Sequence, residues 1–154
     1  MGHGIAIEFA LSGHRVSICS HSDDSLERAR ERISDSLDRL VLLNKVTDET
    51  AALANTSIRA GTDLEEMVSD ADIVVESIYE DLVLKQEMFR KLDQVCPERT
   101  ILASDTTALM PSKLASATKR PEKVLVAHYI NPPFLVPLVE LVPGPETSDE
   151  SVQT

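Results

Sequence analysis

Apolar and polar residues follow one another along this chain with two different periods. Apolar positions three and four residues apart predict amphipathic helices over residues 2–11, 23–41 and 82–95. Ser22 is a predicted N-cap for the second of these helices, and Gly13 is a predicted end signal after the first. Shorter helices are expected after Thr47, at 63–67 and at 111–117. Short apolar segments predict strands at 15–19, 56–60, 72–76, 100–103, 123–127 and 138–142, of which 72–76 is expected to be fully buried.

Predicted strands and helices alternate along the chain, which is typical of an α/β fold with a Rossmann-like, doubly wound and mostly parallel sheet. Such a sheet normally begins with a strand, whereas the first predicted helix begins at Gly2. We therefore expect a sheet that lacks its first strand, with Gly2 as the last glycine of a G-x-G-x-x-G loop; the alternative is a plain N-terminal helix. Residues 1–143 would form the dinucleotide-binding domain, truncated at its N-terminus, and residues 144–154 a connector.

Composition narrows the classes of partner. The 154 residues carry a net charge of -11, which argues against a nucleic-acid partner because no basic stripe is present to neutralise phosphates. No apolar run approaches the roughly 20 residues that a membrane helix needs, and no signal-peptide pattern opens the chain, so we expect a cytoplasmic protein without a membrane partner. The two cysteines, Cys19 and Cys96, lack metal-binding spacing, and no metal site is predicted.

Three side chains near the end of the chain have the character of a catalytic group. His128 follows the apolar strand predicted at 123–127, at the sheet edge where open parallel sheets place their ligands. Asn131 precedes two prolines, which restrict its backbone to extended geometry. Glu140 lies inside an apolar strand, where a carboxylate is costly unless it is paired or faces a polar cavity. Because Leu138 and Val142 share its side of the strand, we expect that this side does not simply face solvent.

Together, His128 and Glu140 form a candidate dyad for oxidising a secondary alcohol. Imidazole is suited to take a hydroxyl proton near neutral pH, and a carboxylate on its other nitrogen would fix the tautomer. Asn131 would donate a hydrogen bond to the substrate oxygen. The alternatives are structural: a histidine without a catalytic role, a glutamate that accepts from a backbone amide or pairs with Lys or Arg, and an asparagine in a turn.

Four stretches of the sequence stand out: residues 75–82 with Lys85, residues 102–107, residues 128–133 and residues 137–142. Together they resemble the 3-hydroxyacyl-CoA dehydrogenase family. The resemblance implies a nicotinamide-binding Rossmann domain, followed by a helical domain that dimerises and completes the active site. It also implies NAD-dependent oxidation of a 3-hydroxyacyl-CoA to the 3-oxoacyl-CoA by hydride transfer. This chain would then be the cofactor-domain fragment, with little or no turnover by itself and a full-length protein that is a homodimer.

Carried over residue by residue, the resemblance makes His128 the catalytic base and Glu140 its partner. It makes Asn131 a contact of the substrate oxygen. Thr107 stands where the family usually has a serine that hydrogen-bonds the reacting oxygen. A threonine keeps this hydroxyl but restricts its rotamer.

Of the residues that the resemblance assigns to the cofactor, Glu80 and Lys85 match the family pattern, whereas Ser20 and Asp105 depart from it. Glu80 and Lys85 match positions that line the ribose and nicotinamide side of the cofactor, although an exposed acid at a helix start and a solvated lysine explain them equally well. Ser20 replaces the usual aspartate that binds the adenine ribose, so NADP is not ruled out by repulsion, but NAD is favoured because no arginine takes its place. Asp105 stands where the family usually has asparagine and would place a charge beside the cofactor.

Smaller features point to a branch of the family. The Asn-Pro-Pro sequence at 131–133, together with residues 109–114 and 143–147, is similar to the lambda-crystallin and L-gulonate 3-dehydrogenase branch, and the surroundings of His128 are similar to carnitine dehydrogenases. The substrate is therefore open between a 3-hydroxyacyl-CoA and a small polar 3-hydroxy acid. A further alternative is a crystallin-like module that binds the dinucleotide without catalysis.

Overall fold

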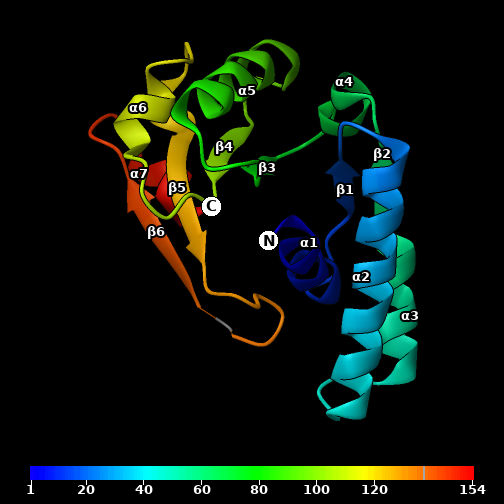
Figure 1. The fold of residues 1–154 in the computed structure, drawn as a ribbon. Helices are drawn as coiled ribbons and strands as arrows, with labels where there is room; N and C mark the ends of the chain where they lie inside the picture. Colours follow the sequence, from blue (N-terminus) through cyan, green and yellow to red (C-terminus); the bar gives the residue numbers. More distant parts are fainter. Residues whose placement is uncertain (137) are drawn as a thin grey trace. The chain divides into compact units, whose positions relative to one another are not determined.

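The computed structural model describes residues 1–136 and 138–154, and the described strands form two separate sheets (Figure 1). The chain divides into two compact units. The first unit contains Met1–Met67 and the segment that begins at Asn131; the second contains Val68–Ile130 and Leu138–Thr154.

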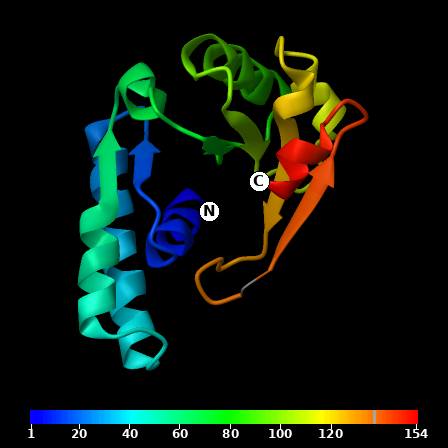
Figure 2. The same cartoon turned by 180° about the vertical axis from the view of Figure 1, so that it is seen from behind.

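The first unit consists of a parallel two-stranded sheet with three longer helices. Strand β1 pairs with β2 in a register that sets Val16 opposite Ile58. Helices α2 and α3 lie side by side along this pair (Figure 2). As predicted, the Ser22 hydroxyl caps α2 by accepting from the Ser25 amide, and Gly13 follows α1 with a φ of 85°. The elements are α1 (Gly2–Leu11), β1 (Val16–Cys19), α2 (Asp23–Leu42), α3 (Asp48–Ser57), β2 (Ile58–Gly61) and α4 (Leu64–Val68), the last of which ends at the boundary of the unit.

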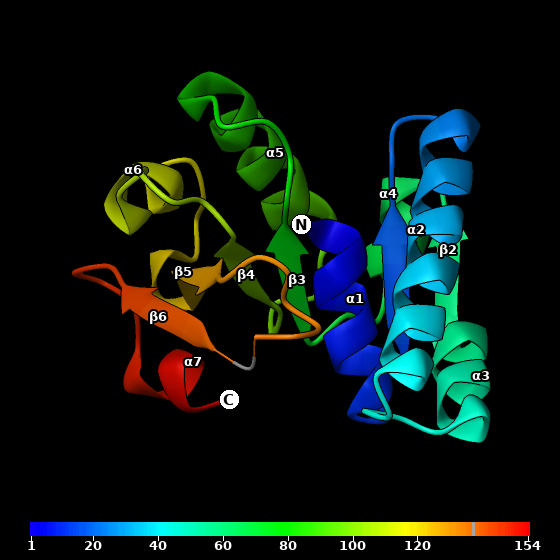
Figure 3. The same ribbon diagram turned by 60° about the horizontal axis from the view of Figure 1, so that its bottom comes forward.

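The second unit contains a four-stranded sheet in the order β3-β4-β5-β6, in which only β6 runs antiparallel to its neighbour. Helices α5 and α6 cover one face of this sheet, and α7 lies on the other (Figure 3). The elements are β3 (Ile73–Glu76), α5 (Leu82–Val95), β4 (Ile101–Ser104), α6 (Pro111–Ala115), the 3-10 helix η1 (Pro121–Lys123), β5 (Val124–Tyr129), β6 (Val139–Pro143) and α7 (Asp149–Gln153).

Each unit has its own aliphatic core. In the first, buried residues of α1, α2 and α3 pack together, among them Ile7, Ile33 and Leu40. In the second, every residue of β4 is buried, and Phe89 and Leu92 of α5 are almost completely excluded from water. Burial of such side chains stabilises each unit by about 1.5–3 kcal/mol per residue relative to exposure.

The α/β class and the mostly parallel strands confirm the prediction from the sequence, but three details differ. The described strands form a two-stranded and a four-stranded sheet where a single sheet was predicted. Strand β3 is only partly buried because it is an edge strand, and Ile73 is 39% exposed. Helix α3 continues through Ser57, so β2 begins two residues later than predicted. The absence of a first strand stays a prediction.

The segment 144–154, predicted to be a connector, is attached to the second unit by several hydrogen bonds. The Thr147 hydroxyl donates to the Val124 carbonyl, and the Ser148 amide donates to the Glu122 carbonyl at 2.9 Å. Ser151, in α7, is buried. The segment therefore packs on the sheet, and the proposed domain boundary at residue 143 stays a prediction.

Candidate functional site

Four of the candidate residues in the second unit lie at or just beyond the carboxyl ends of parallel strands. Glu80 follows β3, and Asp105 and Thr107 follow β4. His128 is the second-last residue of β5. Because β3, β4 and β5 are parallel, these ends meet at one edge of the sheet, where open α/β sheets bind their ligands.

The histidine and glutamate singled out from the sequence are joined in the structure. The antiparallel register of β5 and β6 sets His128 directly opposite Glu140. Nδ1 of His128 lies 2.8 Å from Oε2 of Glu140, within hydrogen-bonding distance. The His128 side chain is 26% exposed and that of Glu140 is 60% exposed, so the pair is accessible from solvent. This geometry confirms the predicted pairing of the two side chains.

The carboxylate determines which imidazole nitrogen is basic. A carboxylate accepts but does not donate, so the Nδ1 atom of His128 carries the proton when the ring is neutral. Nε2 then holds the free lone pair and can accept a proton from a substrate hydroxyl.

One expectation about Glu140 is wrong. Its side of β6 is solvent-exposed, since Leu138 is 55% and Val142 is 44% exposed in the described structure. Strand β6 is an edge strand, and neither of its faces is buried. The carboxylate is therefore tolerated both because it pairs with His128 and because water reaches it.

A buried ion pair, which was not predicted, joins the end of β3 to α5. The Nζ atom of Lys85 is 2.8 Å and 3.0 Å from the two carboxylate oxygens of Glu76. The same carboxylate accepts from the Ser104 hydroxyl at 2.8 Å and from the Ile78 amide at 2.6 Å. The side chains of Lys85 and Glu76 are 0% and 1% exposed. Every hydrogen-bonding group of this pair is thus used within the protein, as a buried charge requires.

The buried position of Lys85 excludes the alternative of a solvated lysine. Its ammonium also lies 3.2 Å from the Ile78 carbonyl and 3.6 Å from a carboxylate oxygen of Glu80. The signal in the sequence was the spacing, because Lys85, Phe89 and Leu92 share the buried face of α5. The partner was also visible, since Glu76 ends an otherwise apolar strand.

Glu80 has a second set of contacts, on the loop that follows β4. Its Oε1 atom accepts from the Thr106 hydroxyl and, at 3.3 Å each, from the amides of Thr107 and Ala108. Burial opposes ionisation, but the Thr106 hydroxyl, the Lys85 ammonium and the two amides together lower the pKa of Glu80. The side chain is 42% exposed, in agreement with the expectation of an exposed acid at a helix start.

Asp105 is half-buried beside this loop. Burial raises the pKa of its carboxyl above the ordinary value, against the lowering effects of the Ser77 hydroxyl and the Lys85 ammonium. Glu76 adds to the increase through like-charge repulsion. An aspartate at this position is therefore harder to ionise than a surface aspartate.

The remaining candidates, Gly2, Ser20 and Asn131, belong to the first unit. Gly2 begins α1, whose first turn has no acidic residue and whose N-cap residue makes no side-chain hydrogen bond. Backbone amides at such a helix end suit a phosphate group. Ser20 follows β1 at its carboxyl end, and Asn131 is exposed and joined to Pro132 by a cis peptide bond. The amides at the start of α1 fit a dinucleotide phosphate. The half-exposed carboxylate of Glu80 fits a ribose hydroxyl.

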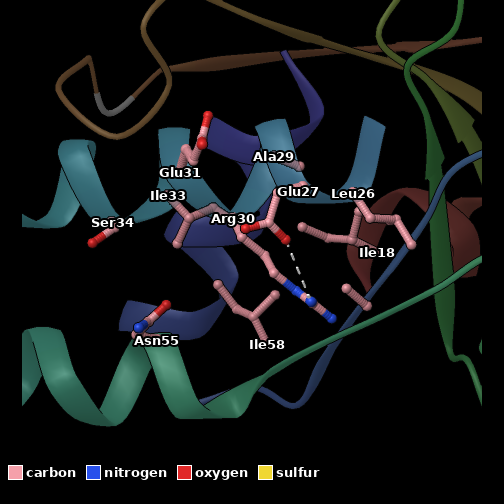
Figure 4. A pocket seen from close by; sticks show the side chains of 11 residues that line it. Ile18, Leu26, Glu27, Ala29, Arg30, Glu31, Ile33, Ser34, Asn55 and Ile58 are labelled. Carbon is pink, nitrogen blue, oxygen red and sulfur yellow. Dashed lines mark ion pairs between the residues drawn. The ribbon is translucent and has the colours of Figure 1, made fainter. Parts of the chain in front are cut away.

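A groove of about 450 Å³ lies elsewhere in the first unit (Figure 4). Its floor is apolar and includes Ile18, Ile33 and Ile58, and its rim carries the ion pair between Glu27 and Arg30 at 3.9 Å. It contains none of the candidate residues. Among residues 1–136 and 138–154, no cluster of metal-ligating side chains occurs and no helix is sufficiently long and apolar to cross a bilayer.

The whole chain is similar to known proteins. The family model for "3-hydroxyacyl-CoA dehydrogenase, NAD binding domain" matches residues 1–154. A 3-hydroxybutyryl-CoA dehydrogenase of Clostridioides difficile is 34% identical over 154 residues, which are 100% of this chain and 54% of that protein. The mitochondrial hydroxyacyl-coenzyme A dehydrogenase of Sus scrofa is 36% identical, over 100% of this chain and 51% of that protein.

A solved structure shows the same architecture. The crystal structure of 3-hydroxybutyryl-CoA dehydrogenase from Escherichia coli K12 superimposes with a TM-score of 0.94 and 35% sequence identity, covering 99% of this chain and 32% of that one. The chain spans about half the length of the curated relatives it matches. These relatives are named hydroxyacyl-CoA or 3-hydroxybutyryl-CoA dehydrogenases rather than lambda-crystallin, so they do not support the predicted branch. Pro137, part of one resembling stretch, lies outside the described residues.

Proposed function

Because the chain belongs to the 3-hydroxyacyl-CoA dehydrogenase family and is its NAD-binding domain, we propose that it serves the NAD-dependent oxidation of a 3-hydroxyacyl-CoA to the 3-oxoacyl-CoA. The observation that carries the proposal is the 2.8 Å contact between His128 and Glu140 at the carboxyl edge of a parallel sheet.

His128 is the general base of the proposed reaction. Its Nε2 atom takes the proton of the substrate's 3-hydroxyl group while the carbon loses hydride, and the imidazole becomes positively charged. Glu140 stabilises this imidazolium through the hydrogen bond at Nδ1 and keeps the ring oriented. When bound, the nicotinamide supplies the acceptor for the hydride.

Two further side chains are assigned to the substrate oxygen. Thr107, exposed in the loop after β4, offers the hydroxyl that the family usually supplies from serine. The family resemblance assigns the side-chain amide of Asn131 to the same oxygen. A hydrogen bond from either group favours the alkoxide character that develops as the proton leaves.

The family resemblance assigns five residues to the cofactor. Gly2 and the first turn of α1 would hold the pyrophosphate, and Ser20 the adenine ribose. Glu80 would accept from a ribose hydroxyl with its Oε2 atom, since Oε1 is engaged by the loop after β4. Asp105 would lie beside this side of the cofactor. Lys85 would act indirectly, because its ammonium is buried and bound to Glu76.

A 3-hydroxyacyl-CoA is preferred over a polar hydroxy acid because relatives of this chain in bacteria and mammals are named for hydroxyacyl-CoA substrates. A helical second domain and a homodimer stay predictions of the family resemblance.

The test is an assay of NADH formation from 3-hydroxybutyryl-CoA. Since the chain spans about half of its relatives, it is assayed alone and in a chimera, flanked by the parts of the Clostridioides difficile relative that lie outside the matched region. In the chimera, His128→Ala is expected to lower kcat/KM by about 10²–10⁴-fold, because a positioned base contributes that factor. His14→Ala, which removes an exposed histidine of the first unit, is the control and should change little.

The same assay with L-gulonate and carnitine tests the substrate. A chimera that oxidises either of these more efficiently than 3-hydroxybutyryl-CoA would contradict the proposed substrate class. Undiminished activity in His128→Ala would contradict the proposed base.

A further inference from the structure

The loop after β4, residues 105–110, lies outside the helices and strands of the second unit. This loop carries Thr107; at its start the Asp105 amide donates to the Glu76 carbonyl at 3.0 Å and the Thr106 amide donates to the Ser104 hydroxyl at 3.3 Å. Internal bonds to the Thr106 hydroxyl, from the amides of Ala108 at 3.4 Å and Leu109 at 3.1 Å, close the turn only in part. The position of the Thr107 backbone therefore depends on a group from outside the loop.

That group is Glu80, from the loop after β3. A single carboxylate oxygen, Oε1, receives the Thr106 hydroxyl and the amides of Thr107 and Ala108. Consecutive backbone amides that converge on one point form a concave anion site, or nest. In this chain the anion is a side chain of the protein itself, 26 to 28 residues earlier in the sequence.

The other carboxylate oxygen of Glu80 contacts the buried ion pair of Lys85 and Glu76. This oxygen lies 3.6 Å from the ammonium of Lys85, which the buried carboxylate of Glu76 fixes in place. The ammonium thus contacts two carboxylates, one buried and one half-exposed. This arrangement joins the loops after β3 and β4 through charged groups rather than through apolar packing.

We propose that Glu80 is a positioning residue, the built-in anion of the nest formed by Thr106, Thr107 and Ala108, and that it sets the place of the Thr107 hydroxyl. The role of Thr107 toward the substrate rests on the proposed function; the positioning of the loop does not. The inference goes beyond a cofactor contact because it assigns Oε1 of Glu80 to the protein itself.

Amide hydrogen exchange of the 154-residue chain, measured by NMR, tests this inference without substrate or cofactor. In Glu80→Ala, the amides of Thr107 and Ala108 should exchange at least about tenfold faster than in the wild type, because they lose a charged acceptor. Formate, a carboxylate small enough to enter the vacated nest, should restore most of the protection. Glu87→Ala, which removes an exposed carboxylate from α5, is the matched control and should show neither effect.

Glu80→Gln provides a second variant with nearly unchanged shape. It keeps an acceptor oxygen but loses the charge, so the acceleration at both amides should be smaller than in Glu80→Ala and should not respond to formate. The inference is overturned if the two amides do not accelerate in Glu80→Ala. It is also overturned if β4 and β5 accelerate equally, which indicates global destabilisation, or if formate has no effect. If the chimera shows no dehydrogenase activity while the 154-residue chain shows this exchange pattern, the proposed function is refuted and the positioning role of Glu80 stands.

Discussion

Glu80 and Asp105 show how two carboxyl groups at one sheet edge are treated differently by their surroundings. Glu80 is half-exposed and accepts three hydrogen bonds on one oxygen, and its pKa is lowered despite some burial. For Asp105 burial is the largest influence, and its pKa is raised. The surroundings therefore favour the charged form of Glu80 and disfavour the charged form of Asp105.

Asp105→Asn is expected to stabilise the protein at neutral pH. Because the folded pKa of Asp105 is raised, the folded state binds more protons than the unfolded state between the ordinary aspartate pKa and the raised one. Stability therefore falls as pH increases through this window, and above it the folded protein carries a disfavoured charge. Asparagine removes that charge, so thermal unfolding should show a higher Tm than the wild type at neutral pH.

The difference in Tm should disappear in acid, where Asp105 is protonated in both states. Asp38→Asn, which changes an exposed aspartate of α2, should leave the Tm nearly unchanged at either pH. An unchanged or lower Tm for Asp105→Asn at neutral pH would show that its charge is not disfavoured in the folded protein.

At the scale of elements, the pair of Lys85 and Glu76 fastens helix α5 to the sheet. Glu76 ends β3, Lys85 lies on the inner face of α5, and Ser104 at the end of β4 completes the contacts. Removal of one member of a buried pair leaves the other charge without compensation, which is more costly than removal of both.

Lys85→Met should accordingly destabilise the protein by about 3–5 kcal/mol in urea unfolding. The double variant Lys85→Met with Glu76→Gln should recover at least about 1 kcal/mol, since it is neutral and keeps an acceptor for the Ser104 hydroxyl. Lys91→Met, an exposed position on the same helix, should remain within about 0.5 kcal/mol of the wild type. A double variant less stable than Lys85→Met would contradict the coupling of the two charges.

The sequence predicted the elements better than their contacts. Helix α5 occupies the predicted residues 82–95, because its apolar spacing is regular and Asp81 caps it. Strand ends shifted by one or two residues, since hydrogen bonding to neighbouring strands rather than local preference decides them. The Glu76–Lys85 pair was missed because lysine is rarely buried, and its partner lies nine residues away in the sequence.

At the scale of the whole molecule, the alternation of strands and helices was sufficient to predict the α/β class and a mostly parallel arrangement. It was not sufficient to predict two sheets, because sheet membership depends on which strands pair. The site behaves similarly: residue types suggested His128 and Glu140, but only the register of β5 with β6 brings their side chains together. Membership of the family rests on similarity along the entire chain.

The account depends most on the proton at Nδ1 of His128, which can be observed in the chain itself by nitrogen-15 NMR of the imidazole rings. We predict that neutral His128 is protonated at Nδ1, and that Glu140→Gln shifts the proton population toward Nε2. The other three histidines provide internal controls and should not respond. A wild-type ring protonated at Nε2, or a tautomer population unaffected by Glu140→Gln, would contradict the proposed dyad.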